Sequence, residues 1–454
     1  MGNESVIRGV NLGKTKENEG INISVKSFIT AIVVIFALMV LTYGLTFVVP
    51  DGGIPFWKWV LSPFLVLGAD GNVSLIAVII FLLVIGGIFN CLDKCGLMQY
   101  MLDTITDRFG ADKYKLLALI TLFFMAMGSM IGSFEEAVPM VPIVVALAVR
   151  LGWNPLVGLG MSILAIGCGF SAGVCNPFTV GVAQELAGLP MFSGIWLRII
   201  SFVVVYVLLI GFLYYYAKKV EKPIDVEAFK HTFTRDEKMS KGLKLFAGIM
   251  CGGILLVLSS VVISFLQDIT MIIVAITFLV AGLLSVVATG RGGNILKTFS
   301  KGIGNVFPAV FMILMANSIK YTMTEGHILE PILQGMVSIA GTLPRWTVIL
   351  FIYLIVLVMN FFISSGSAKA FLLMPLIIPI AETFEISAQL CILAFAFGDG
   401  FSNVLYPTNP VLLISLGLAD VDYGKWFKWS FKFQFLNIVL TSALLLFGLV
   451  IGYR

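Results

Sequence analysis

The chain has 454 residues, of which 59% are hydrophobic and 12% are charged, and its formal net charge is +4. Soluble domains carry about 25% charged residues, so this composition excludes an ordinary soluble protein and favours an all-α integral membrane protein. The apolar runs are long and continuous, which excludes a transmembrane barrel with alternating strands, and the small net charge gives no sign of nucleic-acid binding.

Apolar segments that are long enough to cross a bilayer follow a polar N-terminal stretch, residues 1–26. A span requires about 20 apolar residues. Nine segments meet this requirement: 27–49, 73–91, 155–186, 193–217, 243–265, 269–288, 306–323, 388–418 and 431–453. Asn-Pro interrupts two of them, 155–186 and 388–418, and we expect these two helices to be broken because proline removes a backbone donor.

Two further apolar stretches, 114–150 and 346–381, are too long for one span. Each has small polar residues near its middle, so we expect a re-entrant hairpin that enters the membrane and returns to the same side. The segments just before them, near 96–109 and 326–341, are short and amphipathic, and we expect them to lie in the membrane interface.

One short pattern occurs twice along the chain. Pro142 and Pro375 are 233 positions apart (375 − 142 = 233), and Asn176 and Asn409 have the same separation. Paired, Gly/Pro-interrupted segments in the two halves of a membrane protein are the sequence sign of a secondary transporter's binding site. We therefore divide the chain into a first repeat, 27–217, a Lys-rich linker, 218–242, and a second repeat, 243–454.

Charge asymmetry predicts the orientation in the membrane. The linker 218–242 contains six lysines and Arg235, and by the positive-inside rule it is cytoplasmic. With nine crossings, the N-terminus is then cytoplasmic and the C-terminus external, in a bacterial cytoplasmic membrane. Five crossings separate the two hairpins, so they enter from opposite faces and the repeats are inverted.

Irregular backbone at membrane depth persists only where it lines a cavity or is buried in protein. We expect serine hydroxyls and free N–H groups at the hairpin tips to hold an anion, and free carbonyls at the helix breaks to hold a cation. The tryptophans near span ends are expected to be interfacial anchors: Trp57, Trp59, Trp346, Trp426 and Trp429. The residues expected to bind the substrate or a coupling ion are Ser129, Gly132, Ser133, Glu135, Glu136, Ser171, Asn176, Ser364, Ser365, Gly366, Ser367, Lys369, Asp399, Ser402, Asn403, Thr408 and Asn409.

Ionisable residues inside a membrane cost about 2.5–3.5 kcal/mol each on insertion scales, so each is a functional candidate. Glu135 and Glu136 come from the first half, and Lys369 and Asp399 from the second. Ionised together they carry −2, which requires a compensating cation such as Na⁺, H⁺ or part of the substrate. As an alternative, Lys369 forms a permanent ion pair with one of the carboxylates.

Motifs for other chemistries are missing from the chain. It has no P-loop for ATP and no GxSxG motif with a plausible base. Its two histidines stand in polar loops, so we expect no cofactor and no His-based metal site. The sequence favours a transport protein over an enzyme.

Three motifs together resemble the YfcC/DcuC-type carriers of the ion transporter superfamily. They are Gly-Ser-x-x-Gly-Ser-Phe-Glu-Glu-Ala from Gly128, Ser-Ser-Gly-Ser from Ser364, and Phe-Gly-Asp-Gly-Phe-Ser-Asn from Phe397. The resemblance implies a scaffold domain, a mobile transport domain with two opposed hairpins, elevator-type alternating access and a homodimer. The chain departs from the family pattern at Lys369, where we expect an uncharged residue, and at Asn409-Pro410, where we expect Ser-Gly.

These features favour a secondary active transporter of small charged metabolites. The favoured substrates are amino acids of the basic, arginine- or ornithine-like type, carried by exchange or by ion-coupled alternating access. The alternative is a carrier of C4-dicarboxylates or other organic anions, because Lys369 could receive a carboxylate. An intramembrane enzyme that uses the carboxylates and a channel are further alternatives.

Overall fold

The computed structural model describes residues 25–49, 52–69, 73–109, 112–130, 132, 134–190, 192–223, 236–259 and 270–454. All the regular elements in this part of the chain are helices. Ser133 lies outside the described residues, as do 1–24 and 224–235 of the two segments expected to be cytoplasmic, 1–26 and 218–242. The repeat boundaries therefore stay predictions.

One group of helices, which we call the α15 group, is built on the long helix α15, against which α1, α2 and α3 pack directly. It contains α1 (Val25–Thr46), α2 (Phe56–Leu65), α3 (Val73–Lys94), α12 (Glu237–Ser259), α14 (Thr270–Thr289) and α15 (Ile295–Glu325). α3 packs against both α14 and α15, and α12 packs against α14. α2 was not predicted, because it is short and has Pro63 inside it.

Most of the remaining helices, long and short, form a second group, which we call the hairpin group. Its first-repeat members are α5 (Lys113–Met130), η3 (Glu135–Met140), α6 (Val141–Arg150), α7 (Pro155–Leu159), η4 (Gly160–Leu164), α8 (Ala165–Ser171), η5 (Pro177–Gly181), α9 (Val182–Leu186) and α10 (Ile195–Val220). Its second-repeat members are α17 (Arg345–Phe362), α18 (Gly366–Thr383), α19 (Ala388–Asn403), α20 (Pro410–Leu418) and α21 (Tyr423–Val450).

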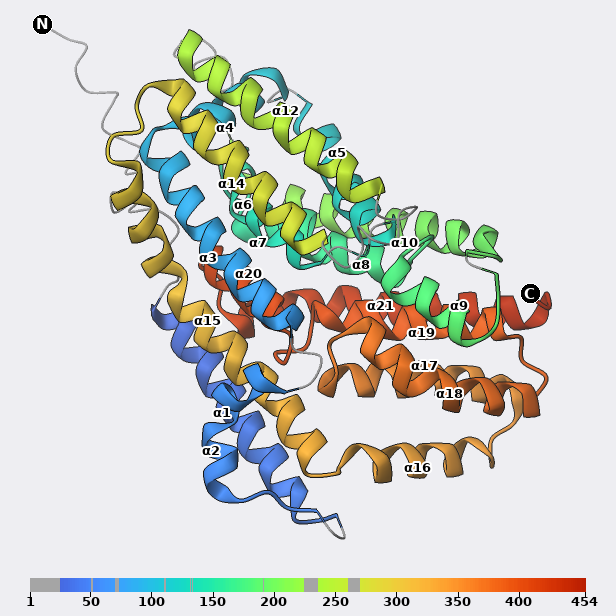
Figure 1. The fold of residues 1–454 in the computed structure, drawn as a ribbon. Coiled ribbons are helices and arrows are strands. Elements are labelled where there is room, and N and C mark those ends of the chain that lie inside the picture. The colour runs from blue at the N-terminus through green and yellow to red at the C-terminus, as the bar shows by residue number, and fades with distance from the viewer. Residues whose placement is uncertain are drawn as a thin grey trace, which may run out of the picture.

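Two short helices connect the groups, α4 (Leu97–Phe109) and α16 (Leu329–Ala340). They correspond to the two predicted interfacial segments. α4 lies near the upper end of the molecule and α16 at the lower end (Figure 1). α5 and α17 therefore start from opposite ends, which is the arrangement that an inverted repeat requires.

The two predicted breaks are present in the helices. The first interrupts the segment 155–186 between α8 and η5, and the second interrupts 388–418 between α19 and α20. Asn176 and Asn409 cap the second pieces, each followed by proline in the first helical turn. Proline is tolerated there because its missing N–H would have no helical partner.

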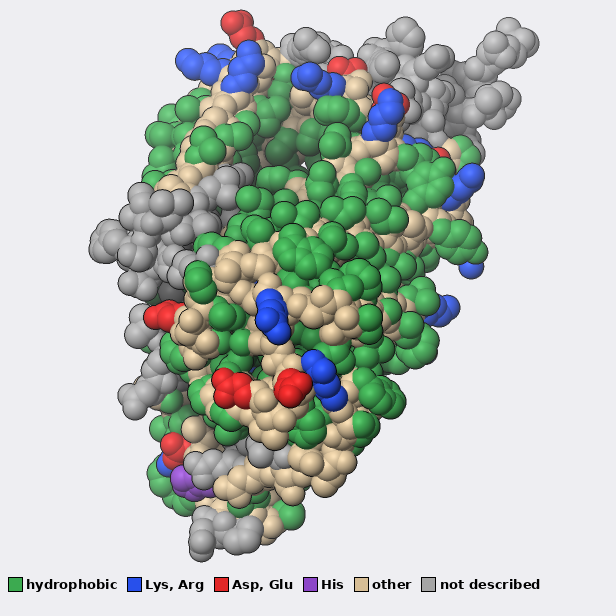
Figure 2. Space-filling model, turned by 90° about the vertical axis from the view of Figure 1, so that its right-hand side faces the viewer, with side chains coloured by type: hydrophobic (Ala, Val, Ile, Leu, Met, Phe, Trp, Pro, Cys, Tyr) green, Lys and Arg blue, Asp and Glu red, His purple; other side chains and the backbone are tan. Residues whose placement is uncertain are grey.

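Within the described residues, seven helices are long and apolar enough to cross a membrane, or up to eight if the bent pair Ile79–Lys94 and Leu97–Phe109 counts as one span. Three of the seven are hairpin helices: α5, α17 and α18. The re-entrant path of the hairpins and the count of nine crossings therefore stay predictions. The space-filling view agrees with a membrane protein, since a broad apolar surface lies below an upper end with several Lys and Arg side chains (Figure 2).

The two halves pack in corresponding ways. α5 packs on α8, α17 packs on α19, and α8 and α19 contact each other. Glycine permits these close approaches, because a Cβ on Gly398 would lie 2.6 Å from Val356 Cβ in α17. Small residues at helix contacts allow membrane helices to approach closely. The contact between α8 and α19 brings the two breaks together.

Candidate substrate and ion site

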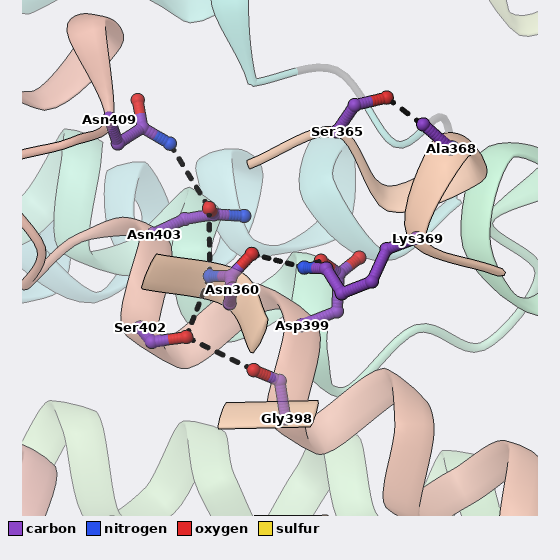
Figure 3. A network of polar contacts seen from close by, with 9 residues as sticks. All are labelled: Asn360, Ser365, Ala368, Lys369, Gly398, Asp399, Ser402, Asn403 and Asn409. Carbon is purple, nitrogen blue, oxygen red and sulfur yellow. Dashed lines mark hydrogen bonds and ion pairs between the residues drawn. The ribbon is translucent and has the colours of Figure 1, made fainter. Parts of the chain in front are cut away.

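Lys369 and Asp399 form an ion pair in the interior of the hairpin group. Both side chains are fully buried. Ser365 caps α18, and Lys369 follows within the first turns of that helix, while Asp399 comes from the C-terminal part of α19. The Lys369 Nζ donates to Asp399 Oδ1 and also to Asn360 Oδ1 (Figure 3). The structure agrees with the alternative in which Lys369 forms an ion pair with a carboxylate, and that carboxylate is Asp399, which belongs to the same half of the chain.

Asn360, near the end of α17, is the centre of this polar network. Its Nδ2 donates to Ser402 Oγ at 2.7 Å and to Asn403 Oδ1 at 3.0 Å. Asn409 Nδ2 donates to the same Asn403 oxygen at 3.1 Å (Figure 3). One amide thus ties the second hairpin to its helix break. The sequence analysis did not select Asn360, although a polar residue in an apolar membrane helix is itself a signal for an interhelical contact.

The first hairpin is tied to its own break through Ser129. The Ser129 Oγ donates to Ala172 O at 2.9 Å and accepts from Val174 N at 2.9 Å. Beyond it, Gly132 has a φ of +75°, a conformation that glycine adopts easily, and a Cβ there would overlap the Asn176 side chain. The first hairpin tip therefore rests directly on the first break.

The second hairpin tip reaches the same place. A Cβ on Gly366 would lie 2.6 Å from Thr179 Cγ2 and 2.6 Å from Asp399 Oδ2. Thr179 follows Asn176 by three residues in η5, so the two tips meet at one short segment. A Cβ on Gly400 would overlap Ser171, which places the ends of the broken helices beside it. The structure thus brings together residues from both tips and both breaks.

Several buried polar atoms at this meeting point have no hydrogen-bond partner among the described residues. They are Ser171 Oγ, Asn176 Nδ2, Thr179 Oγ1 and Asp399 Oδ2, and the hydroxyl of Thr408, the residue before Asn409, is unpaired as well. Leaving a buried polar atom unpaired costs about 1–3 kcal/mol, so native structures rarely tolerate such a cluster without a reason. The set contains a carboxylate oxygen that accepts, an amide that donates and hydroxyls that can do either, which suits a small charged ligand.

The expectation that carbonyls at the second break are free for a cation is wrong for three of them. Side chains of α21 hold these carbonyls: Gln434 Nε2 donates to Phe401 O at 3.0 Å, Trp426 Nε1 to Val404 O at 2.8 Å, and Tyr423 OH to Leu405 O at 2.9 Å. A buried carbonyl needs a donor, and a neighbouring helix supplies it here.

The tryptophan prediction needs correction for the same reason. Trp426 is completely buried and Trp59 and Trp429 are buried to more than nine-tenths, while Trp57 and Trp346 are exposed. Trp59 Nε1 donates to Met39 O at 3.1 Å. Position near a span end does not distinguish a ring that faces lipid from one that packs against another helix.

Arg198 in α10 is a buried residue that the sequence analysis missed. Its Nε donates to Val174 O at 3.1 Å, and its Nη2 donates to Ser193 O at 2.9 Å. Gln389 of α19 lies beside it, since Arg198 Nη1 donates to Gln389 Oε1 at 3.5 Å. Arg198 therefore fixes the loop of the first break against α10 and α19.

The other predicted residues are placed as follows. Ser365 is exposed and its Oγ accepts only a long bond from Ala368 N, at 3.5 Å. Ser364 and Ser367 are half-buried next to it. The backbone of Glu135 and Glu136 starts η3, and their side chains lie outside the described residues. A part for these five residues in binding stays a prediction.

Comparison with known proteins gives a consistent result. The family profile described as "C4-dicarboxylate anaerobic carrier" (DcuC) matches residues 60–450. The chain belongs to this carrier family. Its members are transport proteins, which agrees with the helical fold and the resemblance seen in the motifs.

Two relatives of this carrier are similar over most of their length. A protein of Escherichia coli (strain K12) described as "Putative basic amino acid antiporter YfcC" is 29% identical over 407 residues, which cover 84% of this chain and 78% of that protein. An uncharacterized protein of Haemophilus influenzae is 24% identical over 393 residues, covering 83% and 76%. Among solved structures, the Alcanivorax borkumensis YdaH transporter has a TM-score of 0.47 and 17% identity, covering 93% of this chain and 99% of its own.

Proposed function

We propose that this DcuC-family chain is a secondary active transporter of amino acids, with basic amino acids as the first class of substrate. The observation that carries the proposal is the cluster of unpaired polar atoms where both hairpin tips and both helix breaks meet. A small molecule with an ammonium group and a carboxylate can satisfy both the acceptor Asp399 Oδ2 and the donor Asn176 Nδ2. The relative described as a basic amino acid antiporter supports this class.

Charge supports a cationic substrate over a dianion. Lys369 and Asp399 compensate each other, so the remaining ionisable groups of the predicted site are Glu135 and Glu136, which carry −2 when ionised. A buried negative charge requires a positive partner, and an arginine-like substrate or a coupling cation, Na⁺ or H⁺, would supply it.

A C4-dicarboxylate is the second candidate, favoured by the description of the family. The residue expected to receive a substrate carboxylate was Lys369. Its ammonium already contacts Asp399 and Asn360, so a dicarboxylate would have to displace an ion pair to reach it. The dicarboxylate is therefore the less favoured of the two substrate classes.

We further propose a homodimer in a bacterial cytoplasmic membrane, in which the hairpin group moves relative to the α15 group in an elevator-type cycle. The way the chain connects the two groups supports this, since it passes between them through α4, through the segment between α10 and α12, and through α16. In such a cycle the site is open to one side at a time.

Counterflow in proteoliposomes tests the substrate class. Vesicles loaded with unlabelled arginine, ornithine, succinate or fumarate are given the corresponding labelled compound outside. We expect transient accumulation of labelled arginine or ornithine that depends on the internal amino acid. Exchange of succinate or fumarate without exchange of any amino acid would establish the dicarboxylate alternative. Uptake that does not respond to internal substrate would indicate a channel.

A further inference from the structure

The Lys369 ammonium occupies a position whose surroundings suit a free cation. Its two contacts are a carboxylate oxygen of Asp399 and an amide oxygen of Asn360. Oxygen ligands of this type are those that hard metal cations prefer. The position lies among the first turns of a hairpin helix and the middle of a broken helix, where transporters with discontinuous helices hold coupling ions.

Several other oxygens that a free cation could use in the second half already accept hydrogen bonds. Three carbonyls at the end of α19, of Phe401, Val404 and Leu405, accept hydrogen bonds from side chains of α21. The Asn403 side-chain oxygen accepts from Asn360 and Asn409. In the second half, therefore, the protein's own donors satisfy these oxygens, whereas Asp399 Oδ2 and Thr408 Oγ1 stay unpaired.

The first half has no equivalent of this lysine. In the repeat, Glu136 corresponds to Lys369 and Cys168 to Asp399. The two unpaired hydroxyls of Ser171 and Thr179 also belong to the first half. At the first pair of matching positions the two halves thus carry opposite charges, and at the second pair the first half has a neutral side chain where the second half has a carboxylate.

We propose that Lys369 is a tethered cation, whose ammonium replaces a free coupling cation in the second half of the transporter. The second half then binds no Na⁺, and any ion coupling is confined to the first half. This inference deepens the proposed function, on which its meaning for transport rests, but cation binding can be tested without any transport measurement.

The test compares melting temperatures of the purified full-length protein in NaCl and in choline chloride at equal ionic strength. The variants are Lys369→Ala, Lys369→Ala with Asp399→Asn, and Lys320→Ala as the control. Lys320 is a half-buried lysine of α15 for which the described structure shows no ion pair. Ligand binding to the native state raises stability with the logarithm of ligand concentration above Kd.

We expect Lys369→Ala to melt below the wild type in choline chloride, because Asp399 is left without its cation. NaCl should recover a large part of this loss in a saturable way, with a larger increment than in the wild type. The double variant should show no such extra increment, because the anionic ligand is gone, and Lys320→Ala should respond to NaCl as the wild type does.

An equal NaCl response in Lys369→Ala and the wild type would overturn the inference. So would a Lys369→Ala protein that fails to fold in NaCl while the double variant folds, because Na⁺ would then be unable to replace the ammonium. A second experiment uses the wild type alone and measures hydrogen exchange of residues 360–372 and 395–405. The exchange rates should be the same in NaCl and in choline chloride. Slower exchange of these residues in NaCl would also overturn the inference. Failure of amino-acid counterflow would contradict the proposed function. The measurements of Na⁺ binding would still test the inference about Lys369.

Discussion

Gly366 leaves space for the unpaired carboxylate oxygen of Asp399, since a Cβ on Gly366 would lie only 2.6 Å from Asp399 Oδ2. The same Cβ would lie 2.6 Å from Thr179 Cγ2 in the other half of the molecule. The absence of a side chain at the second hairpin tip therefore lets three elements, α18, α19 and η5, meet at the candidate site.

Gly366→Ala should reduce counterflow strongly. The added methyl group would push the hairpin tip away from Asp399 and Thr179, and overpacking of this kind typically costs about 1–3 kcal/mol. Gly335→Ala in α16 is the matched control, because a Cβ there meets nothing within 4 Å. Counterflow and melting temperature should be measured on both, and normal exchange by Gly366→Ala would contradict the placement of the tip at the site.

Thr179→Val should weaken transport without weakening the fold. The substitution keeps the shape and removes a buried hydroxyl that has no partner among the described residues, so the melting temperature should stay the same or rise. If the hydroxyl binds substrate, the concentration for half-maximal exchange should increase about two- to tenfold, the worth of one hydrogen bond. Thr322→Val in α15 removes an equally buried, unpartnered hydroxyl away from the site and should leave exchange unchanged. Equal effects of the two changes would remove Thr179 from the site.

Glu135→Gln and Glu136→Gln should each lower transport if the first half supplies the negative partner for a cation. Glutamine keeps nearly the same volume and removes the charge, so insertion and melting temperature should change little. Uptake of labelled arginine by the two variants tests whether these carboxylates are needed for transport. Normal uptake by both would sink the proposed role of these glutamates.

Glu221 should make a pH-dependent contribution to stability. Lys113 and Tyr114 at the start of α5 hydrogen-bond to its carboxylate, just after the end of α10. The hydrogen bond from Lys113 is the main cause that lowers the Glu221 pKa below its usual value of 4.5, followed by that from Tyr114. Because the folded protein binds this proton more weakly than the unfolded chain, the contribution is present above pH 4.5 and is lost as the pH falls through the lowered pKa.

Glu221→Gln should therefore lower the melting temperature at pH 7 and have a smaller effect near pH 4. The effect should correspond to about 0.2–1 kcal/mol, as is typical of largely exposed ion pairs. Glu382→Gln removes an exposed carboxylate of α18 for which the described structure shows no ion pair, and it should have little effect at either pH. A loss that is equal at the two pH values would show that the contact does not depend on the charge of Glu221.

A reporter fused after Arg454 tests the predicted orientation. With nine crossings and a cytoplasmic N-terminus, alkaline phosphatase at the C-terminus should be active and green fluorescent protein should be dark. A reporter placed in the linker 218–242 should show the opposite pattern. A C-terminal reporter that is active only in the cytoplasm would mean that the crossing count or one hairpin assignment is wrong.

The sequence by itself determined the helical membrane class and the positions of the two breaks. These features depend on local properties: the length of an apolar run and the missing donor of proline. It also selected Lys369 and Asp399 as functional candidates, because ionisable residues in lipid are rare and expensive.

Only the tertiary structure decided which groups satisfy one another. The pairing of Lys369 with Asp399, the role of Asn360 between α17 and α19, and the contact of Gly366 with Thr179 join residues that are far apart along the chain or on different helices. The sequence predicted that carbonyls at the second break lack hydrogen-bond donors, but side chains of α21 supply these donors. Hydropathy and spacing report what one segment requires, whereas the partner of a buried polar atom depends on how the helices pack, because that packing decides which donor and acceptor lie within about 3 Å of each other.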